Sequence, residues 1–200
     1  MPSMKTIKRL LLLLAVVLLS GCTTTPPSRF YVLTPKTSAP AGAMLSNLVV
    51  GVGPVRLVDY LERPQIVARD SENQLKIEEF DRWGGTLEAN ITWVMAENLS
   101  QALGTDAVVT FPWERAVVPD YQIALDIRRF DPAPNNQVLL SAQWRILGDE
   151  GRQLYAIEIS EFSEAMEGPG FAAQVAAQSR ALARLSDAVA ARIGKLGPGK

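Results

Sequence analysis

The sequence contains no histidine and only one cysteine, and these two shortages remove several classes of chemistry at once. Histidine is the commonest general base, the commonest metal ligand and the usual pH-sensitive side chain. Without it, a Ser-His-Asp triad and a zinc site of the His/Cys kind are both excluded. The chain also has no G-x-S-x-G motif. We therefore expect no metal, no cofactor and no enzymatic activity.

Two patterns that could suggest an enzyme have simpler explanations. Residues 51–53 read Gly-Val-Gly, but Pro54 follows them without an N–H and no helix pattern opens there, so a phosphate-binding loop is not predicted. Glu78 and Glu79 are neighbours in a predicted strand and should point to opposite faces. They cannot form the carboxylate pair of a glycosidase from those positions.

The sequence has no excess of positive charge either. The chain has 20 basic and 21 acidic residues, and Lys5, Lys8 and Arg9 lie at its extreme N-terminus. No basic stripe remains beyond them to neutralise phosphates, so we do not expect nucleic acid as a partner. The hydrophobic fraction of 48% is sufficient for a buried core.

The N-terminal residues have the order of a secretory signal. Lys5, Lys8 and Arg9 precede an unbroken apolar run over residues 10–19. A helix needs roughly 20 apolar residues to span a bilayer, so this run is too short for a permanent transmembrane segment. We predict that residues 1–21 are a signal peptide.

The end of this signal resembles the lipobox of bacterial lipoproteins. Leu19, Ser20 and Gly21 lead directly to Cys22, the only cysteine of the chain. The resemblance implies that the thiol of Cys22 is acylated and that the chain is cleaved before it. It also implies export to the outer membrane, because Thr23 stands where aspartate would favour the inner membrane. The alternative is an ordinary signal peptide with an incidental cysteine.

A short tether, residues 22–29, links the predicted anchor to the rest of the chain. The six residues 23–28 span at most ~21 Å when extended, and Pro26 and Pro27 stiffen them. The domain should therefore lie close to its membrane. A partner on the other side of the periplasm would have to reach toward it.

Two segments have apolar residues at steps of three and four, the spacing of an amphipathic helix. They cover residues 86–103 and 171–193. Thr86 suits the start of the first helix and Gly104 suits its end. A helical turn is also expected within residues 57–62, before Pro64.

Strand patterns occupy most of the remaining chain. They cover residues 48–55, 65–69, 75–80, 107–111, 121–127, 138–146 and 155–159. Tyr155, Ile157 and Ile159 alternate with other residues in the last of these and should share one buried face. We predict one α+β domain over residues 30–194, a mostly antiparallel sheet with two main helices packed on one face, and a flexible tail over 195–200.

A candidate partner interface lies in two loops. Tyr60, Leu61, Arg63 and Pro64 could present an exposed aromatic and a charge to a partner, or could simply be turn chemistry. Trp83 precedes the first long helix, where a tryptophan is either a core residue or part of a contact surface.

The ordered set of segments 29–35, 50–55, 60–67 and 80–83 resembles the PqiC-like auxiliary lipoprotein family of MCE-type ABC transporters. The resemblance covers nearly the whole mature domain. It implies a non-enzymatic subunit, anchored at the outer membrane, that docks the periplasmic MCE-domain assembly and supports lipid trafficking and envelope integrity. A homo-oligomer is compatible with that role. The alternative is a freestanding lipid carrier with its own apolar cavity.

Overall fold

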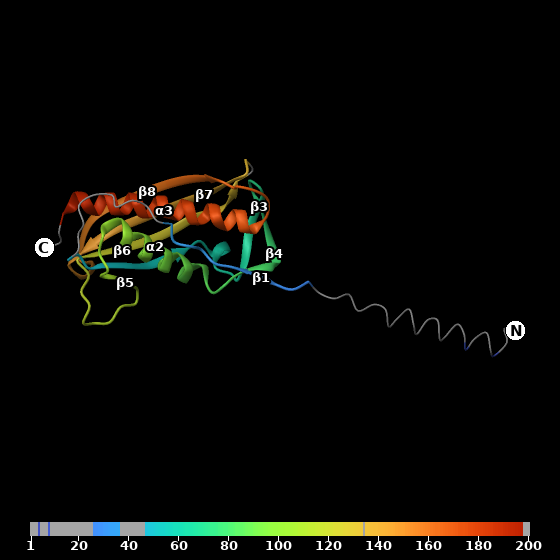
Figure 1. Cartoon of the computed structure of the whole chain (residues 1–200), viewed down its shortest axis with the longest axis horizontal. Helices are drawn as coiled ribbons and strands as arrows, with labels where there is room; N and C mark the ends of the chain where they lie inside the picture. The colour runs from blue at the N-terminus through green and yellow to red at the C-terminus, as the bar shows by residue number, and fades with distance from the viewer. Residues whose placement is uncertain (1–3, 5–7, 9–25, 37–46, 134, 198–200) are drawn as a thin grey trace.

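The computed structural model describes residues 4, 8, 26–36, 47–133 and 135–197. This part of the chain forms an α+β domain in which two helices pack on β-sheets (Figure 1). The predicted fold class is therefore confirmed. The lipobox and Cys22 lie outside the described residues.

The elements follow the predicted order with shifted ends. The strands are β1 (Arg29–Tyr31), β2 (Val50–Leu57), β3 (Gln65–Ser71), β4 (Gln74–Trp83), β5 (Val108–Thr110), β6 (Tyr121–Ala133), β7 (Gln137–Gly148) and β8 (Gln153–Ala165). The helices are α2 (Leu87–Leu103) and α3 (Phe171–Leu196), with short 3-10 turns η1 (Asp59–Leu61) and η2 (Asp149–Gly151). The turn η1 lies within the predicted helical turn at 57–62.

The larger sheet is mixed, whereas a mostly antiparallel sheet was predicted. Its order is β5-β2-β6-β7-β8, and the pairs β6–β7 and β7–β8 are antiparallel. β2 runs parallel to both β5 and β6. Parallel neighbours require a long crossover, which the chain makes through β3, β4 and α2 before returning to the sheet. Local apolar patterns carry no information on such distant pairings.

A second sheet of three strands, β1-β4-β3, lies at one end of the domain (Figure 1). β3 and β4 form the predicted hairpin and pair antiparallel. β1 adds to β4 in the parallel direction, with Tyr31 opposite Trp83. The strand at the end of the predicted tether is thereby tied into the folded domain.

The two helices pack against each other and against the larger sheet. The Thr86 side chain caps α2 by accepting a 3.2 Å hydrogen bond from the Ala89 amide, and Gly104 ends it in the left-handed conformation. Both predicted helix caps are confirmed. The side chain of Asn98, which interrupts the apolar stripe of α2, is buried and donates to the Ser186 hydroxyl of α3 at 3.3 Å.

The strand β8 departs from prediction in the face that it buries. Ile157 and Ile159 are 54% and 57% exposed, on the side of the sheet away from the helices. The inner face of β8 carries Glu158 and Glu164 instead, which pair with arginines of α3. Alternation indicates which residues share a face, but the register with β7 decides which face is covered.

The domain is elongated, with its two ends formed by different elements (Figure 1). The 13 residues of β6 extend for roughly 40 Å, and the 26 residues of α3 for about the same length. At one end, the proximal end, Tyr31 of β1 packs on Phe171 at the start of α3. At the other, the distal end, the Tyr121 hydroxyl donates to the Gly197 carbonyl at 3.1 Å.

Candidate partner-binding surfaces

All five residues of the predicted interface lie toward the proximal end, but two of them are buried. Leu61 is 3% exposed and Trp83 4% exposed, and both belong to the hydrophobic core. The Trp83 amide also donates to the Pro64 carbonyl at 2.8 Å, which joins the two predicted loops. Pro64 itself is exposed, while Tyr60 and Arg63 are half-buried. A partner-binding role for this set stays a prediction.

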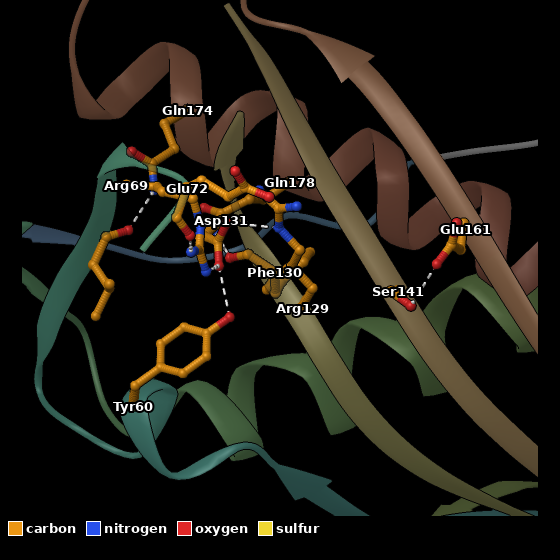
Figure 2. Close-up of polar contacts among 11 residues, drawn as sticks. Tyr60, Arg69, Glu72, Arg129, Phe130, Asp131, Ser141, Glu161, Gln174 and Gln178 are labelled. Carbon is orange, nitrogen blue, oxygen red and sulfur yellow. Dashed lines mark hydrogen bonds and ion pairs between the residues drawn. The ribbon is translucent and has the colours of Figure 1, made fainter. Parts of the chain in front are cut away.

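Tyr60 is held by a buried ionic cluster (Figure 2). Its hydroxyl donates to Oδ2 of Asp131 at 2.6 Å. Arg69 donates from two nitrogens to the same carboxylate, each at 3.1 Å, and Arg129 donates to Oδ1 at 3.0 Å. Asp131 is fully buried. The cluster thus joins η1 and β3 to the end of β6.

The hydrogen bonds of this cluster outweigh the cost of burying its charge. Burial alone would raise the pKa of Asp131, but the donors around it hold that pKa below its ordinary value. Burial and the bond to Asp131 together raise the pKa of Tyr60 to about 12. The carboxylate is therefore ionised and the phenol neutral at neutral pH, the states in which each hydrogen bond is strongest.

A second ion pair ties the start of the domain to the proximal sheet. Arg29 donates to both oxygens of Asp81 at 2.8 Å, and the Tyr31 hydroxyl donates to Oδ1 at 2.9 Å. Hydrogen bonding from Arg29 is the main reason that the pKa of Asp81 lies below its usual range. β1, which begins at the last residue of the predicted tether, is fixed by these contacts.

Three of the predicted residues line one small cavity. Leu61, Arg63 and Pro64 face Thr86 and Leu87 at the start of α2, around a volume of about 310 Å³. Nε of Arg63 is buried and has no hydrogen-bond partner in the described part of the chain. The structure therefore brings part of the predicted interface together around this cavity. Leu61 and Trp83 also belong to the core, and Tyr60 belongs to the ionic cluster.

The distal end carries exposed aromatic and aliphatic side chains that the sequence analysis did not single out. Trp93 of α2 is 51% exposed, and Phe111 and Val118 in the segment after β5 are 50% and 58% exposed. Phe111 packs edge-on against Trp113, with ring centroids 5.4 Å apart. Trp93 lies two residues after Ile91, about 200° around the helix from the buried stripe. This position, on the opposite side of the helix from the buried stripe, is the feature of the sequence that indicates an exposed Trp93.

Two hollows flank Trp113 at this end. The larger, of about 580 Å³, lies between α2 and the segment after β5, and its lining includes Trp93, Glu97, Val108, Pro112, Trp113 and Glu114. We call it the distal groove. The smaller, of about 440 Å³, is lined in part by Val118, Gln122 and Leu147. Concave surfaces with exposed aromatic residues are typical of binding sites.

A third apolar surface runs along the side of the domain. Leu154, Ile157 and Ile159 lie on the outer face of β8 and are each about half exposed. β8 is also an edge strand, since β7 is its only neighbour in the sheet as described. We call these three residues the lateral row. An exposed apolar row on a free strand edge is a surface that pairs readily with other chains.

Within the described residues, no group of three or more acidic, histidine or cysteine side chains is placed to hold a metal ion. The helices of this same part of the chain are too short or too polar to cross a bilayer.

Residues 31–190 match the family model of the ABC-type transport auxiliary lipoprotein component. The chain belongs to this family. It is therefore an auxiliary lipoprotein of ABC-type transport, and the predicted family resemblance is confirmed. Comparison with curated proteins found no match.

Solved structures with a TM-score of 0.70 share the fold of this auxiliary lipoprotein at low sequence identity. A crystal structure of protein XCC0632 from Xanthomonas campestris, of the DUF330 family, is 18% identical over 84% of this chain and 98% of its own, with a TM-score of 0.70. A structure described as an uncharacterized protein has the same identity and TM-score and is covered over 99% of its length. More distant is a PelC dodecamer from Paraburkholderia phytofirmans, 12% identical over 78% of this chain and 96% of that one, with a TM-score of 0.45.

Proposed function

We propose that acylated Cys22 holds this lipoprotein at the outer membrane, where the domain docks the periplasmic MCE-domain assembly of an ABC transporter. Family membership supports a role in ABC-type transport. The lipobox-like sequence Leu19–Cys22 and the following Thr23 support the anchor and its membrane. In this proposal the partner's channel moves the lipid, and the lipoprotein contributes position and contact rather than catalysis.

The observation that carries the proposal is the separation of the two ends. Residues 22–29 enter the domain at β1, so the anchor holds the proximal end close to the bilayer. Phe30, 68% exposed, lies eight residues after Cys22 and can be no more than about 29 Å from it. The distal end of the domain lies roughly 40 Å further away, the length of β6 and α3. A subunit that bridges a membrane and a periplasmic partner needs this arrangement.

The lateral row supports self-association as part of the same role. Copies anchored through the same residue share one membrane plane, and they would meet along their sides rather than at their ends. The row formed by Leu154, Ile157 and Ile159 lies on such a side, on the outer face of the first half of β8. We therefore propose a second copy of this chain as its partner.

A freestanding lipid carrier is the second candidate. It would need a cavity for an acyl chain, and the space between the helices and the larger sheet is occupied by large side chains that are almost fully buried, such as Leu125, Trp144 and Leu185. The exposed apolar residues instead lie on outer surfaces, where they favour contact with proteins.

The test is capture of the full-length lipoprotein from crosslinked, detergent-solubilised envelopes, with identification by mass spectrometry. The docking role predicts recovery of an MCE-domain protein together with its permease and ATPase. The Cys22→Ser variant should lose both the acyl mass and the recovery. Recovery of the lipoprotein alone with bound phospholipid would replace the docking role by the carrier role.

A further inference from the structure

The distal groove is built from two elements that are far apart in the sequence. One wall is the outer surface of α2, where Trp93 and Glu97 lie one helical turn apart. The other wall is the segment that follows β5, which contributes Pro112, Trp113 and Glu114. Between them the hollow has a volume of about 580 Å³, large enough for several side chains of a bound segment.

The second wall is fixed against the sheet. The indole of Trp113 lies on Gly51, so close that a Cβ at position 51 would be 2.8 Å from its ring. The Phe111 amide donates to the Val52 carbonyl at 2.8 Å, and the ring of Phe111 supports Trp113 edge-on. Further along, the Asp120 amide donates to the Val49 carbonyl at 2.9 Å. A groove with walls held in this way does not have to be ordered when a ligand binds, which favours affinity.

The rim of the groove is acidic. Glu97 and Glu114 both lie on it and both are exposed. In the part of the chain that the structure describes, neither carboxylate has an ion-pair partner. The exposed ring of Trp93 lies on the same lining and adds an aromatic face that attracts cations. The groove therefore combines apolar walls with unpaired negative charge.

We infer that the distal groove binds a segment of the periplasmic partner that is apolar on one side and carries lysine or arginine on the other. The apolar side packs on Trp93, Val108 and Trp113, and the basic side chains pair with Glu97 and Glu114. The inference rests on the proposed docking function, because it assigns that function's contact to one surface. It also specifies the chemistry of the partner, which the family description leaves open.

The test compares capture of the MCE-domain protein by wild type and by two groove variants of the full-length lipoprotein. Trp93→Ala removes the exposed aromatic face, and truncation of a central aromatic residue commonly weakens an interface by tenfold or more. Glu97→Lys reverses one rim charge and should weaken capture. It should also abolish most of the salt dependence of capture between 0.1 and 0.5 M NaCl, a range over which the screening length changes about twofold.

The matched controls are Phe30→Ala and Glu72→Lys, which make similar changes at exposed positions of the proximal end. The inference is supported if both groove variants lose capture while both controls retain it. Capture by Trp93→Ala and Glu97→Lys at the level of wild type would overturn the groove assignment and leave the docking function standing. Absence of the MCE-domain protein from the wild-type sample would overturn both.

A photo-crosslinking amino acid at position 93 gives an independent test, because it detects the contact directly and does not depend on a variant that loses binding. We expect a covalent adduct with the MCE-domain protein from position 93 and none from position 30. An adduct from position 30 alone would place the contact at the proximal end and overturn the assignment.

Discussion

The hydroxyl of Tyr60 donates a 2.6 Å hydrogen bond to the buried carboxylate of Asp131, across 71 residues of sequence. Tyr60 lies in η1 and Asp131 lies near the end of β6. This bond therefore attaches the loop between the two sheets to the larger sheet. Arg69 of β3 binds the same carboxylate. A tyrosine predicted as a contact residue is thus part of the joint between the sheets.

Removal of the Tyr60 hydroxyl should therefore cost folding stability. A hydrogen bond to a charged group contributes about 1.5–3 kcal/mol, and Tyr60→Phe should lower the free energy of unfolding by an amount in that range. Urea denaturation at pH 7 measures it. Tyr155→Phe is the matched control, because Tyr155 is exposed and has no hydrogen bond in the described residues. Equal stability of the two variants would contradict the structural role of Tyr60.

Asp131 should make the protein sensitive to acid. Its pKa is below the ordinary value in the folded state, so the unfolded chain takes up its proton first as pH falls. The stabilisation from Asp131 is present above about pH 4, the unfolded pKa, and is lost as pH falls through the folded pKa. The free energy of unfolding should decrease from pH 5 to pH 3.

The variant Asp131→Asn separates this effect from other carboxylates. It should be less stable than wild type at pH 7 by about 3 kcal/mol, because two arginines lose their ionic partner. It should also lose less stability than wild type between pH 5 and pH 3. Asp81, whose pKa is lowered as well, accounts for part of the decrease that remains. Identical pH profiles would show that Asp131 does not titrate as described.

The features predicted well from the sequence are those fixed by neighbouring residues. Thr86 and Gly104 mark the ends of α2 because a helix cap depends only on nearby backbone groups. β7 covers the predicted strand at 138–146 and alternates strictly between buried and half-buried residues. Both results follow from local geometry, which a single sequence contains.

The features missed depend on contacts between distant segments. The parallel pairing of β2 with β5 and β6 requires a crossover that no local pattern encodes. The outward direction of Ile157 is set by its register with Arg145 of β7. Trp83 is buried, which corresponds to the core alternative given for it, whereas the exposed Trp93 is absent from the predicted interface.

Gly51 should tolerate no side chain, because Trp113 lies directly on it. A Cβ at this position would be 2.8 Å from Cζ3 of Trp113 and 2.9 Å from Cγ of Pro119. Gly51→Ala should lower the free energy of unfolding by roughly 1–3 kcal/mol and shift the tryptophan fluorescence, since the indole must move. Thermal unfolding and emission spectra measure the two effects.

A second glycine supplies the control for this substitution. Gly194 lies in α3 and has open space around it, with nothing within 4 Å of where a Cβ would lie, and Ala is the better helix former. Gly194→Ala should raise stability by up to about 1 kcal/mol and leave the fluorescence unchanged. If Gly51→Ala behaved in the same way, Trp113 would not be packed on Gly51 and the wall of the distal groove would not be fixed.

The lateral row should govern self-association without contributing to the fold of one copy. Ile157 and Ile159 are more than half exposed, and substitutions at such positions usually change stability by less than about 0.5 kcal/mol. The double variant Ile157→Ser/Ile159→Ser should therefore unfold like wild type in urea. It should lose the oligomer that we expect native mass spectrometry to detect for wild type in detergent. Val32→Ser, at an equally exposed position of the proximal end, should keep it. If the double variant retained the wild-type mass, another surface would join the copies, and the lateral row would need a different partner.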